Sequence, residues 1–294
     1  MCPICKSEKY NSVGIPKLDE KSKKIINKEY QVVQCIECKF YYVYPEIELS
    51  SVEWKLLYDE NYFTEQTDWY KRIRAKHRKQ RIEKLNTLCE NDVKNFLDIG
   101  CGEGYMLLEA VSNGWIAYGV DITDNRISES NNSKISFVNS DLLSAKFPDD
   151  FFDCIYMDSI LEHVLNTKEH IHEIKRILKK GGVAYIGVPN EDSLQNDIKK
   201  FLNIITGHKK YSPKIKPFLS PYHVSGFNKY SLSSLIKKSD LKIELLRNFS
   251  TKSVFRMTTF ASKDFLPAIF LTMINLIALL IRREYYLETY VKKK

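Results

Sequence analysis

Three glycines at alternate positions, Gly100, Gly102 and Gly104, lie in the stretch NFLDIGCGEGYMLLEA, which is typical of a strand, a tight turn and the start of a helix. Glycines in such a turn let a ligand approach the main chain closely. The dinucleotide-binding pattern would need a further glycine where the chain has Tyr105, and the Gly-Lys-Ser/Thr ending of a P-loop is absent. Asp98 adds a negative charge, which disfavours a pyrophosphate and favours a ligand with ammonium or sulfonium groups.

Acidic residues follow the next two predicted strands. Asp121 closes the strand IAYGVDIT, 21 residues after Gly100, and a carboxylate at this place can accept hydrogen bonds from both hydroxyls of a ribose. Asp141 and Leu142 lie at the end of the next strand, ISFVNSD. Because ligands of open α/β sheets bind at the carboxyl ends of the strands, we expect these residues to line one site with the glycine turn.

Two C-x2-C pairs lie near the start of the sequence, Cys2 with Cys5 and Cys35 with Cys38, and 29 residues separate them. Four soft thiolates in two such pairs suit a tetrahedral Zn²⁺, and the site would be structural because the protein fills all four positions. A redox pair and unligated cysteines are the alternatives. No apolar leader is found, so free thiols are expected and disulfides are not. The sequence predicts a zinc-ribbon module over residues 1–45.

The later part of the sequence alternates between predicted strands and helices, which is typical of a parallel sheet with crossover helices. One helix is predicted from an N-cap at Asn166, with Leu178 on its inward face. Residues 46–92 are predicted to form a helical cap or linker that contains the basic run KRIRAKHRKQR as a solvated helix face. The predicted fold is α/β, with residues 93–294 as the main domain.

The segments LDIGCGEG, VDI, NSDL and FDCIYMDSILEHV, in this order and spacing, resemble the class I S-adenosylmethionine-dependent methyltransferases. The resemblance covers about residues 96–190. It implies a Rossmann-like sheet of seven strands, the last antiparallel, with helices on both faces, and S-adenosylmethionine as the cofactor. It also implies that the glycine turn approaches the methionine moiety, Asp121 holds the ribose, and Asp141 with Leu142 binds the adenine edge. The cofactor-binding residues implied are Asp98, Gly100, Cys101, Gly102, Gly104, Asp121, Ile122, Asp141, Leu142 and Met157.

The order of the whole chain, from the cysteine pairs to SPYHVSGFNKYSLSSLI, resembles bacterial methyltransferases of sugar and natural-product pathways. It also partly resembles the longer sugar C-methyltransferases with a zinc-binding N-terminus. The resemblance implies O-methylation of a sugar or a sugar-bearing intermediate, nucleotide- or lipid-linked, in surface polysaccharide or natural-product biosynthesis. Two alternatives stay open: an RNA methyltransferase that binds nucleic acid through the zinc ribbon and the basic helix, and a protein that binds the donor without catalysis.

Two histidines, His163 in LEHV and His223 in SPYHVSGF, are placed for acid–base chemistry in such an enzyme. Methyl transfer to a hydroxyl requires removal of a proton, which histidine can accept near neutral pH. A role in stabilising a loop is the alternative for each. The quinone-pathway O-methyltransferases hold a metal ion with a second glutamate before the LEH motif; Ser159 stands there in this chain, which disfavours a Mg²⁺ site at Asp158, Glu162 and His163.

The prolines, lysines and aromatic residues of 207–228 predict a semi-rigid substrate flap. The lysines at 209, 210, 214 and 216 would meet the phosphates of an acceptor, and Tyr211, Phe218 and Tyr222 would stack on sugar faces. A lid that only excludes water is the alternative.

The segment FLPAIFLTMINLIALLI, residues 265–281, has 17 residues without a charge and sits at the lower limit for a membrane span. A helix buried against the protein or a homodimer partner is favoured over a helix on a membrane surface or along an apolar substrate groove. A span is disfavoured because it would carry the last strand away from its sheet. The net charge of +8 allows anionic partners without selecting one. We expect a cytoplasmic protein, and contact with the inner face of the membrane stays open.

Overall fold

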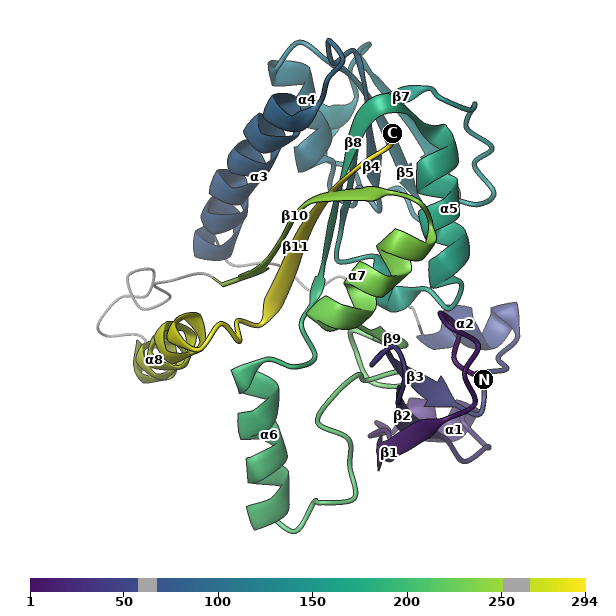
Figure 1. The fold of residues 1–294 in the computed structure, drawn as a ribbon, viewed down its shortest axis with the longest axis vertical. Helices are drawn as coiled ribbons and strands as arrows, with labels where there is room; N and C mark the ends of the chain where they lie inside the picture. The colour runs from purple at the N-terminus through teal and green to yellow at the C-terminus, as the bar shows by residue number, and fades with distance from the viewer. Residues whose placement is uncertain (58–67, 251–264) are drawn as a thin grey trace.

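The computed structural model describes residues 1–57, 68–250 and 265–294. Its centre is a seven-stranded sheet in the order β10-β11-β8-β7-β4-β5-β6 (Figure 1). Neighbouring strands are parallel, except that β11 is antiparallel to β8 and to β10. The strands are β4 (Asn95–Ile99), β5 (Ile116–Asp121), β6 (Ile135–Asn139), β7 (Phe152–Asp158), β8 (Leu178–Pro189), β10 (Lys242–Phe249) and β11 (Tyr286–Lys292). The predicted α/β fold, with seven strands and an antiparallel last strand, is confirmed.

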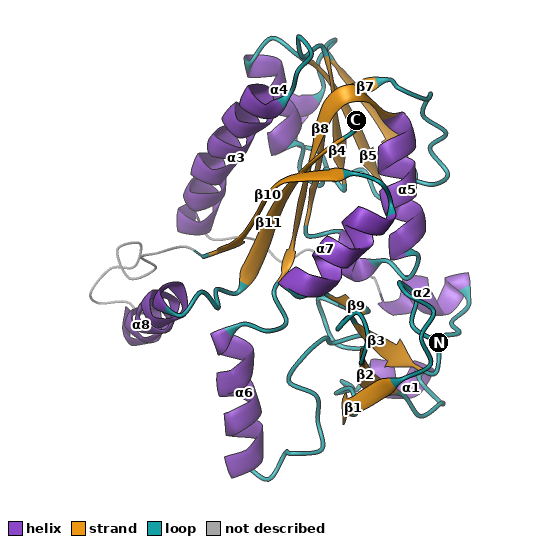
Figure 2. Ribbon diagram, in the orientation of Figure 1, coloured by secondary structure: helices purple, strands orange, loops and turns teal. Residues whose placement is uncertain are grey.

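Helices cover both faces of this sheet (Figure 2). On one face α3 packs against α4, and on the other α5 packs against α7; their bounds are α3 (Asp68–Leu88), α4 (Tyr105–Ser112), α5 (Thr167–Ile177) and α7 (Lys229–Lys238). Successive residues of a strand point to opposite faces, so Phe96 of β4 belongs to the apolar cluster on one face and Leu97 to the cluster on the other. Burial on both faces is usual for parallel strands.

A smaller four-stranded sheet, in the order β1-β2-β3-β9, carries the cysteine pairs (Figure 1). Its elements are β1 (Tyr10–Gly14), α1 (Ser22–Ile25), β2 (Gln31–Cys35), β3 (Tyr41–Tyr44) and β9 (Ser225–Gly226), and α2 (Ser51–Leu57) follows β3 in the chain. The two-residue strand β9 comes from the predicted flap and pairs antiparallel with β3. Cys2, Cys35 and Cys38 belong to the same apolar cluster as Leu97 and Phe227, so the two sheets share a core.

The structure corrects the prediction for the helix at 166–178. Asn166 is the N-cap residue as predicted, without a capping hydrogen bond from its side chain, but α5 ends at Ile177. Leu178 is the first residue of β8 because it pairs with Phe152 in the parallel ladder between β7 and β8. Long-range pairing therefore overrides the helical pattern at this residue.

Two further helices lie beyond β8. α6 (Leu194–Ile205) was not predicted; Ser193 is its N-cap, and the Ser193 side chain accepts a hydrogen bond from the N–H of Asn196. α8 (Phe265–Leu280) forms within the predicted apolar segment. Among the described helices, none combines the length and apolar character needed to cross a membrane.

Candidate active site

The glycine turn joins the carboxyl end of β4 to the start of α4, and its glycines are left-handed: φ is +70° at Gly100, +48° at Gly102 and +81° at Gly104. A Cβ on Gly100 would lie 2.1 Å from Cδ1 of Ile160, and one on Gly104 would lie 2.9 Å from Cβ of Ser130. A Cβ on Gly102 would meet no described atom within 4 Å. Two of the glycines thus fit crowded places, whereas Gly102 faces open space where a ligand can approach the main chain.

Asp121, at the carboxyl end of β5, is tied to the glycine turn. The N–H of Gly102 donates to its Oδ2 at 2.9 Å, and the N–H of Thr123 donates to its Oδ1 at 3.2 Å. Ile122, the next residue, is 63% exposed. The predicted ribose acceptor and the predicted backbone site therefore lie side by side at one edge of the sheet.

Of the other residues predicted to bind the donor, Asp141 is exposed at the edge of the sheet, whereas Leu142, Cys101 and Met157 are buried. The carboxylate of Asp141, after β6, accepts hydrogen bonds from two main-chain N–H groups, and although burial opposes the charge, these bonds lower its pKa. Leu142 is buried beside it. The side chains of Cys101 and Met157 are buried in apolar clusters, so contact of either residue with a donor would involve its main chain.

Asp98 lies buried next to the turn, and only 3% of it is exposed. Burial raises its pKa well above the usual value, the charges of Asp158 and Asp121 raise it further, and Arg78 partly opposes the shift. A cationic ligand would favour the ionised carboxylate. The site is therefore electrostatically suited to a positively charged donor.

Asp158, at the carboxyl end of β7, is already engaged. Arg81 places Nη1 2.7 Å from its Oδ2, and the hydroxyls of Tyr156 and Tyr286 donate to its carboxylate at 2.9 and 2.6 Å. Arg81 also pairs with Glu288 at 2.9 Å. The prediction of a solvated basic face on α3 is wrong at Arg81, which is buried. Asp158 is thus not placed to bind a metal, and Arg81 is not available to a nucleic-acid phosphate.

Both predicted histidines lie in one group with Glu162, at the carboxyl edge beyond β7. The ring centroids of His163 and His223 are 4.9 Å apart, with the rings nearly perpendicular. One potential ligand atom from each of the three residues lies within 4.8 Å of the others. Both carboxylate oxygens of Glu162 are buried, and no described group hydrogen-bonds to them. The group can hold a divalent cation or a polar part of a substrate.

The environment of this group keeps both imidazoles neutral at pH 7. Burial lowers the pKa of His163 to about 4, and main-chain hydrogen bonds to Tyr222 and Pro221 partly oppose the shift. Burial also lowers the pKa of His223 to about 3, with smaller effects from the charges of His163, Lys216 and Lys199. A neutral imidazole can accept a proton or bind a metal ion.

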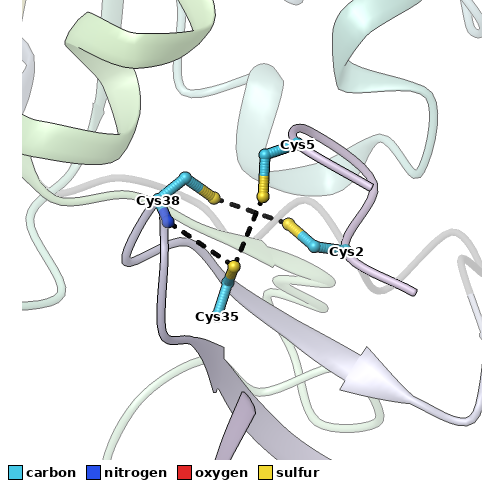
Figure 3. A group of neighbouring side chains, drawn as sticks. All are labelled: Cys2, Cys5, Cys35 and Cys38. Atoms are coloured by element: carbon cyan, nitrogen blue, oxygen red, sulfur yellow. Dashed lines mark hydrogen bonds between the residues drawn. The ribbon is translucent and has the colours of Figure 1, made fainter. Parts of the chain in front are cut away.

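The four predicted zinc ligands converge in the smaller sheet (Figure 3). The Sγ atoms of Cys2 and Cys38 are 3.5 Å apart, those of Cys5 and Cys35 are 3.4 Å apart, and all four lie within 4.8 Å of one another. Sulfurs bound tetrahedrally at the usual Zn–S distance lie about 3.8 Å apart. The neighbouring Cys38 thiol lowers the pKa of Cys2 to about 5. The residues therefore fit a tetrahedral metal ion.

The predicted flap packs onto the smaller sheet. Phe218 and Tyr222 are buried, and the ring centroid of Phe218 lies 5.0 Å from that of Tyr30. The prediction that these two rings stack on sugar faces is wrong because they fill a core. The flap is also held against the active-site edge, since the N–H of Val224 donates to the main-chain carbonyl of Glu162 at 2.9 Å.

Comparison with known proteins identifies the family. Residues 58–246 match the sequence profile of the family described as "Methyltransferase domain". A probable S-adenosylmethionine-dependent methyltransferase of Mycolicibacterium smegmatis is 24% identical over 153 residues, 51% of this chain and 53% of that protein. The 27-O-demethylrifamycin SV methyltransferase of Amycolatopsis mediterranei is 25% identical over 124 residues, 38% of this chain and 46% of that protein. The chain belongs to this methyltransferase family.

Solved structures show the same fold. The 1,6-didemethyltoxoflavin-N1-methyltransferase of Burkholderia thailandensis, solved with S-adenosylhomocysteine bound, aligns with a TM-score of 0.56 at 11% identity and covers 88% of this chain and 97% of its own. A SAM-dependent methyltransferase of Archaeoglobus fulgidus aligns with a TM-score of 0.52 at 18% identity, over 74% of this chain and 94% of its own. This chain therefore has the fold of S-adenosylmethionine-dependent methyltransferases, and it spans about half or less of the length of the curated relatives that it matches.

On the prediction that Asp121 accepts the ribose hydroxyls, Asp121→Ala is expected to weaken binding of S-adenosylhomocysteine by roughly 1–3 kcal/mol, because those hydroxyls would lose their acceptor. Isothermal titration calorimetry measures this loss. Asp121→Asn is the matched control, since an amide oxygen can still accept from Gly102 and preserve the turn. Unchanged affinity in Asp121→Ala would show that the donor lies elsewhere.

Proposed function

We propose that the donor binds across the carboxyl ends of β4, β5 and β6, and that the enzyme methylates a hydroxyl of a sugar-bearing intermediate that carries phosphate. In this proposal Gly102 faces the methionine moiety, Asp98 faces its charged groups, and Asp121 accepts the ribose hydroxyls. The open space at Gly102 and its hydrogen bond to Asp121 support this placement. An oxygen acceptor is supported by the relative whose printed name is 27-O-demethylrifamycin SV methyltransferase.

A group of lysine charges beside His223 is the observation that carries the acceptor proposal. Lys216 and Lys199 both contribute to the lowered pKa of His223. Lys199 is exposed on α6; partial desolvation and the nearby charges of Lys216 and Lys214 lower its pKa, which the charge of Glu191 partly opposes. The Lys214 ammonium already donates to the main-chain carbonyl of Glu191 at 2.5 Å. Lys199 also donates to Oδ1 of Asn196 at 3.1 Å, but Lys199 and Lys216 are exposed whereas Lys214 is half-buried. In this proposal Lys199 and Lys216 are therefore the cations that meet a phosphate of a nucleotide- or lipid-linked sugar.

In this proposal the histidine pair binds and deprotonates the acceptor hydroxyl. Methyl transfer is an in-line displacement, so catalysis depends mainly on aligning the hydroxyl oxygen with the methyl group of the donor. A neutral imidazole of His163 or His223 would accept a hydrogen bond from the hydroxyl and take its proton as the methyl group moves. Burial raises the pKa of the Glu162 carboxyl well above its usual value, and the resulting imidazolium would favour the ionised carboxylate, which in turn would stabilise it. A divalent cation bound by the same three residues is the alternative.

Lys199→Met and Lys216→Met are each expected to raise KM for a phosphate-bearing acceptor about tenfold with little change in kcat, because a charge-assisted hydrogen bond is lost. The assay compares nucleoside diphosphate sugars with the matching free sugars as methyl acceptors. Lys238→Met, at the exposed end of α7, is the control. Methylation of free sugars as efficient as that of phosphate-bearing ones would contradict the proposed acceptor class.

We also propose that Cys2, Cys5, Cys35 and Cys38 bind one structural zinc ion. The convergence of four thiol sulfurs at distances close to those of a tetrahedral site supports this proposal. The ion would hold the start of the chain against β2. Because both belong to the core that the two sheets share, the ion would also stabilise the position of the loop that carries His223. The zinc would take no part in methyl transfer.

A further inference from the structure

Helix α8 has mostly small and polar residues facing the protein, whereas most of its large apolar residues face outward. Ala268, Thr272, Asn275 and Ala278 are buried and recur at helical spacing along one stripe, and Ile274 is the large apolar residue buried beside them. The exposed residues are Leu266, Phe270, Leu271, Met273, Leu276, Ile277, Leu279 and Leu280, with exposed fractions between 38% and 83%. A surface helix of a globular protein normally shows the reverse arrangement. The outer face of α8 is therefore built to contact something apolar.

Helix α6 contacts α8 and repeats this arrangement. Its only buried residue is Asn196, whereas Phe201, Leu202, Ile204 and Ile205 are 47–62% exposed. The two helices meet through a polar contact, in which the side-chain amide of Gln195 donates to Asn275 at 3.1 Å. Both lie on the same side of the molecule, away from the helices on the sheet (Figure 1). We call the exposed apolar residues of α6 and α8 the apolar surface.

The charge around the apolar surface selects its partner. Residues 194–216 contain six lysines and one aspartate, and residues 265–283 contain two arginines and no acidic residue. These segments carry seven more positive than negative charges. Two copies of one chain that met through this surface would bring like charges together, which is unfavourable. An anionic lipid bilayer offers both an apolar interior and negative headgroups.

We infer that the apolar surface of α6 and α8 docks the enzyme on an anionic membrane, with both helices in the interface and the exposed lysines and Arg282 at the headgroups. The 16 residues of α8 would be about 24 Å long, less than the roughly 30 Å of a hydrocarbon core. The surface therefore fits lying on the bilayer rather than crossing it. Lys199 links this surface to the active site, because it lies on α6 and its charge acts on His223. Docking would thus hold the acceptor entrance near the headgroups.

Vesicle cosedimentation tests this inference without reference to the acceptor. The wild-type protein is expected to bind vesicles of phosphatidylglycerol and phosphatidylcholine, and to bind pure phosphatidylcholine at least about tenfold more weakly. A double variant, Phe201→Ser with Phe270→Ser, is expected to lose at least about 30-fold in affinity, since two exposed phenyl rings no longer insert. Lys200→Glu with Lys209→Glu should also lose at least about 30-fold.

Matched controls come from helices α2 and α7, which do not contribute to the apolar surface. Val52→Ser with Leu56→Ser removes two exposed apolar side chains from α2, and Lys238→Glu reverses a charge on α7; both should keep wild-type vesicle binding. The inference is overturned if the wild-type protein fails to bind anionic vesicles. It is also overturned if sedimentation velocity without lipid shows a stable dimer that Phe201→Ser with Phe270→Ser abolishes, since a second copy would then cover the surface.

Discussion

Cys35→Ser is expected to release the zinc ion and to lower the free energy of unfolding by more than about 4 kcal/mol, because three thiols cannot complete a tetrahedral site and metal binding is coupled to folding. The loss should extend beyond the smaller sheet, since Cys35 is buried in the cluster that contains Leu97 and Phe227. Binding of S-adenosylhomocysteine should weaken less than stability, because the glycine turn and Asp121 belong to the seven-stranded sheet, whereas Cys35 lies in the smaller sheet. Native mass spectrometry reports the zinc content, and chemical denaturation followed by circular dichroism reports the stability.

Cys89→Ser is the matched control for this experiment. Cys89 lies outside the four-cysteine group, and its thiol donates a long hydrogen bond to the carbonyl of Asp153 at 3.5 Å, which a serine hydroxyl can also make. The variant should keep one zinc ion per chain. A fully folded wild-type protein with no metal in native mass spectrometry would refute the zinc proposal.

His223→Ala is expected to lower turnover by about 10²–10⁴-fold while leaving donor affinity nearly unchanged, because a group that aligns or deprotonates the acceptor acts mainly in the transition state. His223 lies on the flap next to His163, and the charges of Lys216 and Lys199 act on its pKa, whereas the residues predicted to bind the donor follow β4, β5 and β6. Single-turnover methylation measures the chemical step, and calorimetry with S-adenosylhomocysteine measures donor affinity. His172→Ala, at an exposed position of α5, is the control.

Glu162→Gln separates the two roles that the histidine pair could have. If the pair acts as the base, this variant keeps both imidazoles, and its activity should not depend on added divalent cations. If the three residues hold a cation, the wild-type protein should lose activity with a chelator and recover it with added metal, and Glu162→Gln should bind that metal more weakly by calorimetry. Unchanged turnover in His223→Ala would mean that His163 acts as the base, or that catalysis depends only on the alignment of the acceptor with the donor.

Features that are local in the chain could be predicted from the sequence. The glycine turn, Asp121 after the following strand and the paired C-x2-C spacing each depend on a short segment whose residue types restrict the backbone or the chemistry. The alternation of strands and helices then led to the parallel sheet, and the resemblance predicted the antiparallel last strand. The structure has both. Here local conformation and overall fold agree, as expected of a sequence that folds to one structure.

Features that depend on distant partners were decided only by the tertiary structure. Leu178 continues a helical pattern yet begins a strand, because Phe152 pairs with it. Phe218 and Tyr222 have the composition of a binding loop but fill a core, and Arg81 in a basic run is buried against Asp158. The sequence also placed Thr272 and Asn275 on one stripe of α8 but could not say whether that stripe faces inward. Periodicity shows that residues share a face, whereas the direction of that face depends on what the rest of the chain packs against it.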